Sequence, residues 1–216
     1  MASRIIHLSM TYRLENHLTI KNKNRFRLGQ LIPDAILRTD HDHSVSHFKV
    51  ACKDYKHKMI DFRAFYQAYR DHILQDDLYM GYLLHLIADG CYREFMINHR
   101  QVNQENSRKI VEEIHNDYRL LNHYFINKYQ LKADVVLPDK LQRESLYKTY
   151  DYKALDLIRD LGEDFVLHGQ GDCIHLTPGL MEDYMNQAID LSLQAYNQIV
   201  QGYLDLDPED FAWPSQ

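Results

Sequence analysis

The segment GYLLHLIADG, residues 81–90, decides how this chain folds, because it has the composition of the centre of a buried helix. Only His85 and Asp89 in it can carry charge near neutral pH, and the rest is apolar, small or tyrosine. At about 100° per residue, apolar side chains surround the whole helix, which is typical of a buried helix. A buried carboxylate without a partner is costly, so Asp89 needs a partner.

Two kinds of partner for Asp89 are open. In a structural interpretation, Asp89 pairs with an arginine or lysine of another helix, and His85 is an ordinary core histidine. In a metal-binding interpretation, the i, i+4 spacing puts both side chains on one helical face, which suits chelation of a single ion. One pair of residues does not decide between the two.

Three further ligand-type side chains stand in apolar surroundings elsewhere in the chain. His7 lies in RIIHLSM, Asp34 in GQLIPDAIL and His47 in SVSHFKV. With His85 and Asp89 they make a set of imidazoles and carboxylates without thiolates. Such a set suits zinc, manganese or iron in a hydrolytic site better than a structural zinc site built on cysteines.

The rest of the 216 residues indicates a single all-α domain, spanning 1–216, with many helices around the buried one. Glycine and proline are few, and no series of strands is visible. Residues 32–60 indicate a long loop or short helical turns, 168–179 a turn or short hairpin, and the acidic tail 204–216 a flexible end that Trp213 could dock. Helices are predicted over residues 4–18, 22–31, 61–74, 77–98, 103–129, 138–148, 151–165 and 178–203.

Composition excludes several classes of protein. No apolar run approaches the roughly 18 residues of a membrane span, and the N-terminus lacks the pattern of a signal peptide, so a cytoplasmic protein is expected. The three cysteines are widely spaced, which indicates neither a disulfide framework nor a thiolate zinc site. A net charge of −6 argues against a nucleic acid held by bulk electrostatics.

Four short pieces, in this order, carry a resemblance to a known family. They are RIIHL (4–8), LGQLIPD (28–34), SHF (46–48) and GYLLHLIAD (81–89), and NDYRLLN (116–122) adds to them. Together they resemble the zinc-dependent phospholipase C family, and in particular its small bacterial members without a signal peptide. The resemblance covers about residues 1–130.

The resemblance implies an all-α fold and a metal-dependent hydrolase. It implies that Asp34, His47, His85 and Asp89 hold one ion. His7 would join Asp89 at a neighbouring ion, so that Asp89 bridges the two. The implied reaction is phosphoester hydrolysis by a metal-activated water, with a small-molecule phosphoester or a phospholipid as substrate. We expect Asp34 to act as general base as well as ligand.

The chain also departs from this family. The family uses an N-terminal tryptophan as a ligand, whereas no tryptophan precedes Trp213 here. Its third ion takes two histidines and a glutamate, and Arg119 stands where that glutamate is expected. One or two ions are therefore expected rather than three. His115 and Asp117 are the candidates for an additional metal or substrate contact, with Asp117 preferred because it belongs to NDYRLLN.

Two rival functions are kept open. An HD-type phosphohydrolase is also helical and metal-dependent, but its His-Asp doublet could only be His41–Asp42, in a polar run that indicates a solvated loop. A non-catalytic helical domain could keep the same pocket for binding a metal or another ligand. Turnover of a phosphoester would separate an enzyme from a binding domain.

Overall fold

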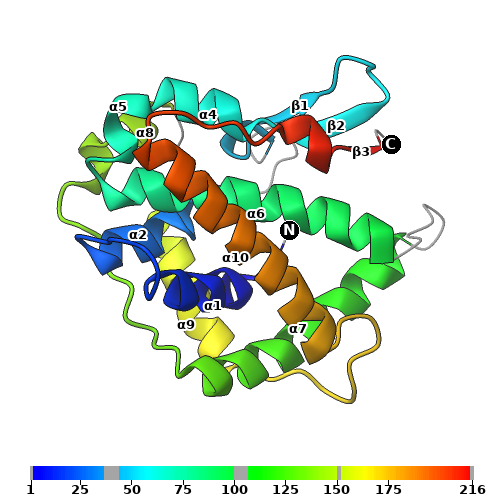
Figure 1. Cartoon of the computed structure of the whole chain (residues 1–216). Helices are drawn as coiled ribbons and strands as arrows, with labels where there is room; N and C mark the ends of the chain where they lie inside the picture. The colour runs from blue at the N-terminus through cyan, green and yellow to red at the C-terminus, as the bar shows by residue number, and fades with distance from the viewer. Residues whose placement is uncertain (1, 37–43, 100–106, 150–151, 215–216) are drawn as a thin grey trace.

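The computed structural model describes residues 2–36, 44–99, 107–149 and 152–214 (Figure 1). It is mostly helical with one small sheet, which confirms the predicted all-α single domain. The described helices are α1 (Arg4–Leu14), α2 (Lys23–Gly29), α4 (Phe62–Ala68), α5 (Arg70–Ile73), α6 (Asp77–His99), α7 (Ser107–Tyr129), α8 (Ser145–Thr149), α9 (Ala154–Val166) and α10 (Pro178–Val200). Short 3₁₀ turns are η1 (Ile32–Asp34), η3 (Leu141–Arg143) and η4 (Pro208–Phe211).

Several helix boundaries differ from the prediction. The helix predicted over 61–74 is divided into α4 and α5, because Tyr69 has a non-helical backbone (φ −121°, ψ 20°). The helix predicted over 138–148 is a 3₁₀ turn followed by the short α8. The first helix ends at Leu14, earlier than predicted, although the chain continues through a turn to the buried Leu18.

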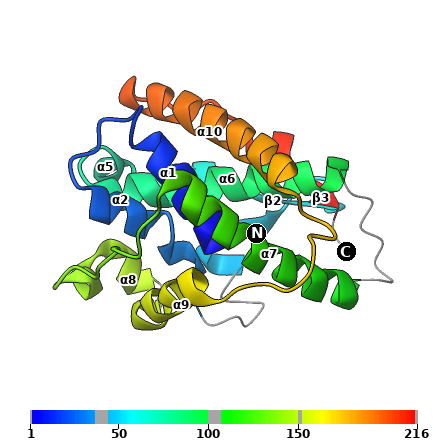
Figure 2. The same ribbon diagram turned by 90° about the horizontal axis from the view of Figure 1, so that it is seen from below.

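Helix α6 is the buried centre of the fold, as the opening segment predicts. Every residue from 78 to 92 is buried. α6 packs against α2 and α10, and also contacts α4 and α5. Figure 2 shows α1 and α6 in a middle layer, with α10 on one side and α8 and α9 on the other. Side chains on all sides of α6 therefore meet other parts of the protein.

Two glycines allow α2 and α6 to cross with their backbones in contact. A Cβ added at Gly81 would lie 2.3 Å from the carbonyl oxygen of Phe26, and one added at Gly29 would lie 2.2 Å from that of Leu78. No residue that carries a Cβ fits at such distances without moving a backbone. The crossing matters for the site because Gln30 follows α2 directly.

We expect Gly81→Ala to destabilise the protein by about 1–3 kcal/mol or more, since the methyl group must push α2 away from α6. Gly90→Ala in the same helix is the matched control, because its new Cβ would meet only the Phe211 side chain at 3.7 Å. Alanine favours the helix there by up to about 1 kcal/mol. Urea unfolding measures both variants, and equal free energies of unfolding would contradict the close crossing.

The small sheet was not predicted. It contains β1 (Lys49–Ala51), β2 (His57–Ile60) and β3 (Trp213–Pro214), all antiparallel and in that order. The expectation of a flexible tail is thus corrected, since the end of the described chain returns as the third strand. Residues 32–60, expected as a long loop or short helical turns, contain the short helical turn η1 and also the two unpredicted strands β1 and β2. Trp213 docks, as suggested, with the Arg93 guanidinium carbon 5.4 Å from its ring centroid. Strands of two to four residues are too short to show an alternating pattern.

Candidate metal centre

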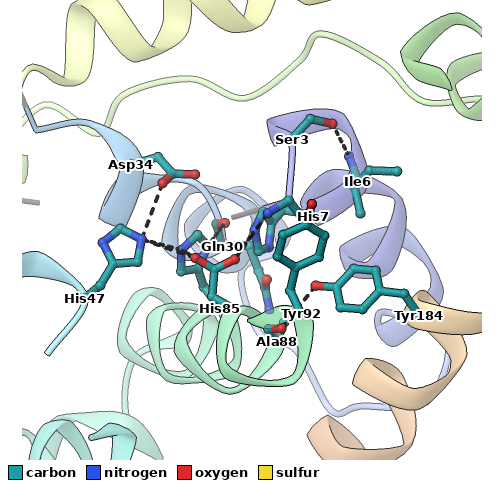
Figure 3. A network of polar contacts seen from close by, with 12 residues as sticks. Ser3, Ile6, His7, Gln30, Asp34, His47, His85, Ala88, Tyr92 and Tyr184 are labelled. Atoms are coloured by element: carbon teal, nitrogen blue, oxygen red, sulfur yellow. Dashed lines mark hydrogen bonds and ion pairs between the residues drawn. The ribbon is translucent and has the colours of Figure 1, made fainter. Parts of the chain in front are cut away.

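The structure brings together all five predicted ligands, which come from separate parts of the chain. His7 lies on α1, Asp34 ends η1, His47 precedes β1, and His85 and Asp89 lie on α6. Figure 3 shows His7, Asp34, His47 and His85 converging on one point. Their side chains are fully buried except that of Asp34, which is 10% exposed.

His85 is prepared to act as a ligand through its far ring nitrogen. Its Nδ1 lies 2.8 Å from the carbonyl oxygen of Gln30, to which it donates its proton. Burial, and then repulsion from His7, lower the pKa of His85 to about 3. The ring is therefore neutral at neutral pH, and the lone pair of Nε2 points into the cluster. The glycine crossing of α2 and α6 makes this possible by holding Gln30 against α6.

His47 Nε2 is as close to the ligand atoms of three other residues as ligands around one ion are to one another. His47 Nε2 lies 3.2 Å from His85 Nε2, 3.4 Å from Asp34 Oδ1 and 3.5 Å from Asp89 Oδ2. His85 Nε2 lies 3.8 Å from Asp89 Oδ2. Nitrogen ligands about 2.0–2.1 Å from a tetrahedral zinc are about 3.3–3.4 Å apart. The residues therefore fit a zinc ion, or a similar divalent ion, held by Asp34, His47, His85 and Asp89.

The two oxygens of Asp89 face different histidines. Oδ2 faces His47 and His85, whereas Oδ1 lies 3.3 Å from His7 Nε2 and accepts a hydrogen bond from the backbone N–H of Ala2 at 3.4 Å. Two overlapping ligand groups result, one of Asp34, His47 and His85 and the other of His7, His85 and Asp89. The two groups share His85, and the two oxygens of Asp89 contact His7 on one side and His47 and His85 on the other.

Unsatisfied polar atoms in the cluster fit a site that binds a cation. Among the described residues, both ring nitrogens of His7 and Oδ2 of Asp89 are buried without a hydrogen bond. Each such atom costs about 1–3 kcal/mol. The ion-pair contacts of Asp89 within the same residues are all with histidines, and no arginine or lysine pairs with it. The structural interpretation therefore lacks the basic partner that it requires.

The surroundings keep both carboxylates ionised. Burial raises the pKa of Asp89, but the contact with His7, followed by the electrostatic influence of the surrounding groups, outweighs burial, so the pKa lies well below the ordinary value. Burial also raises the pKa of Asp34, and the contact with His47 reverses the direction there too. Both side chains thus offer anionic oxygens to a cation.

The two additional candidates have different places. Asp117 is buried, and its carboxylate accepts backbone N–H groups of Ile174 at 2.9 Å, His175 at 2.6 Å and Leu176 at 2.8 Å. It organises the 168–177 segment, belongs to neither ligand group, and the preference for Asp117 is thereby corrected. His115 instead lines the cleft described next. The doublet His41–Asp42 lies outside the described residues.

A cleft of about 1110 Å³ opens beside the cluster and includes Asp34 and Ala2 in its lining. Its acidic lining residues are Asp34, Glu163 and Asp164, and its basic ones are Arg4, Lys49, Lys58, Arg93 and Arg119. This basic excess is local, because the chain as a whole carries a net charge of −6. Most of these basic residues carry no local sequence pattern that predicts a place beside the cluster. For Arg93 a signal existed, since it continues the i, i+4 series of His85 and Asp89.

Comparisons with known proteins add no further assignment. No family model, no curated protein and no solved structure matches the chain. No helix among the described residues combines the length and apolarity that crossing a membrane requires. Cys52, Cys91 and Cys173 are free thiols, and neither ligand group contains one.

Proposed function

We propose that this protein is a metal-dependent hydrolase of phosphoesters that uses zinc, manganese or iron, with one or two ions per chain. The carrying observation is that His47 Nε2 lies 3.2–3.5 Å from ligand atoms of His85, Asp34 and Asp89, so that side chains from three segments of the chain meet beside a basic cleft. A divalent ion bound there supplies a Lewis acid that brings the pKa of water toward neutrality.

Different residues would hold the ion, accept the proton and contact the phosphoryl group. His47, His85 and Asp89 are fully buried and hold the ion. Asp34 both faces the cluster and lines the cleft, so it can accept a proton from the attacking water as general base. Arg4, whose Nε lies 2.6 Å from Asp164, lines the cleft and offers positive charge to the phosphoryl oxygens.

The cationic cleft favours an anionic substrate, which supports phosphoesters over neutral esters or amides. Phosphomonoesters, phosphodiesters and phospholipids all remain within this class, and a cytoplasmic location stays a prediction. The function is tested by screening these three kinds of substrate with each metal, beside Asp89→Asn protein purified in parallel. Turnover in Asp89→Asn equal to that of wild type would come from a contaminant. Metal binding without turnover of any substrate would favour the non-catalytic alternative.

Metal removal gives a direct test of the centre. Protein purified without chelator is expected to contain about one to two equivalents of a divalent ion by elemental analysis. Because the ion binds the folded state, an ion at 100 times its dissociation constant adds about 2.7 kcal/mol of stability. For a chain of this size, removing it should lower the melting temperature by roughly 5–10 °C. Protein that takes up no zinc, manganese or iron, and melts identically with chelator, would contradict the metal centre.

A further inference from the structure

One face of the small sheet carries two lysines into the cleft. In the antiparallel register Lys58 lies opposite both Ala51 and Trp213, and Lys49 lies opposite Ile60. Residues two apart on a strand point to the same face, so the side chains of Lys49, Lys58 and Trp213 share one face. All three line the cleft.

Arg93 adds a third cation to the lining of the same cleft. It lies on α6 one turn beyond Asp89, and its guanidinium stacks over the ring of Trp213. Its Nε is buried and makes no hydrogen bond to the residues that the structure describes. Stacking on an aromatic ring orients the guanidinium without using its N–H groups, which stay available to a ligand.

These three cations make no ion pair with a carboxylate in the described part of the chain, whereas several arginines elsewhere in it do. Arg25 pairs with Asp76 and Glu144, and Arg27 pairs with Glu15. For Lys49, Lys58 and Arg93, by contrast, no ion pair with a described carboxylate exists. The three like charges repel one another, and an anion placed among them would relieve this repulsion.

We infer that Lys49, Lys58 and Arg93 form an anion-binding subsite beside the candidate metal centre, which takes a phosphate group of the ligand other than the one that is hydrolysed. Only the distinction between this phosphate group and the hydrolysed one rests on the proposed function. The fork of Arg93 suits two phosphate oxygens at once, and the lysines add point charges. The phosphate can belong to a soluble compound with two phosphate groups or to the headgroup of an anionic lipid.

Trp213 makes the subsite directly observable, because it is the only tryptophan in the chain. We expect inorganic phosphate, added to the full chain at constant ionic strength, to change the tryptophan emission saturably. Arg93→Gln should weaken phosphate binding at least about tenfold, since charge-assisted hydrogen bonds to the guanidinium are lost. Because this variant also alters the surroundings of Trp213, calorimetric titration with phosphate serves as the second measurement.

Two further variants guard against a folding defect. Lys58→Gln should also weaken binding, and Lys58 is exposed on its strand, so its replacement leaves the core intact. Lys56→Gln is the matched control, since Lys56 is an exposed lysine of the same hairpin that does not line the cleft. Unchanged phosphate affinity in both Arg93→Gln and Lys58→Gln, or an equal loss in Lys56→Gln, would overturn the inference.

The subsite and the metal centre are separated by repeating the titration in Asp89→Asn. Phosphate binding that persists there, and is lost in Arg93→Gln, supports the subsite even if no phosphoester is ever turned over. Binding lost in Asp89→Asn but kept in Arg93→Gln assigns phosphate to the metal centre alone and overturns the subsite. A soluble bisphosphate and vesicles containing phosphatidic acid, each compared between wild type and Arg93→Gln, identify which source of phosphate the subsite takes.

Discussion

Replacing Asp89 with alanine is expected to release the metal and to lower turnover by at least about 10³-fold, since a bound ion contributes several kcal/mol to catalysis. The reason is the position of the two carboxylate oxygens. One faces His47 and His85 and the other faces His7, so a single substitution removes a carboxylate that contacts all three histidines. Elemental analysis and steady-state turnover of the best substrate measure the two effects.

Asp89→Asn keeps the shape of the side chain but removes its charge and offers only one good ligand oxygen, so it should bind metal more weakly than wild type and more strongly than Asp89→Ala. Asp117→Asn is a useful control, because Asp117 is equally buried but belongs to neither ligand group. That control should lose stability and keep its metal. If Asp89→Ala retained metal and were destabilised equally with and without chelator, Asp89 would be a structural residue.

Asp34→Asn is expected to lower turnover by about 10²–10⁴-fold while metal content stays near that of wild type. The amide keeps an oxygen toward the ion but cannot accept a proton from water. Asp34 is the only cluster residue whose side chain is partly exposed to the cleft, where that water must enter. Turnover and elemental analysis of the same preparation give the comparison.

His47→Ala provides the reference for a residue that acts as ligand alone. Its Nε2 is close to three other ligand atoms, so metal content and turnover should fall together in that variant. If Asp34→Asn behaved in the same way as His47→Ala, with occupancy and activity lost in parallel, Asp34 would be a ligand without a role as base.

The local pattern of the sequence determined the burial of α6 and the shared face of His85 and Asp89. An apolar run of helical length has only one stable place in a folded domain, and the spacing of side chains around a helix follows from its geometry alone. The apolar surroundings of His7, Asp34 and His47 likewise predicted that these side chains are buried. The local sequence did not predict that the three side chains lie close together.

Only the tertiary structure decided which of these residues come together and what surrounds them. Gly29 and Gly81 let α2 approach α6 until the carbonyl of Gln30 reaches His85, and no periodicity records such a contact between elements. The sequence favoured Asp117 over His115 as a candidate, but in the folded protein the loop of residues 174–176 covers Asp117 and leaves His115 in the cleft. The anion-binding subsite forms only because β3, from the far end of the chain, pairs with β2 and places Trp213 against Arg93. Sequence patterns report the burial of each residue in its own element, whereas distances between elements arise only when those elements pack.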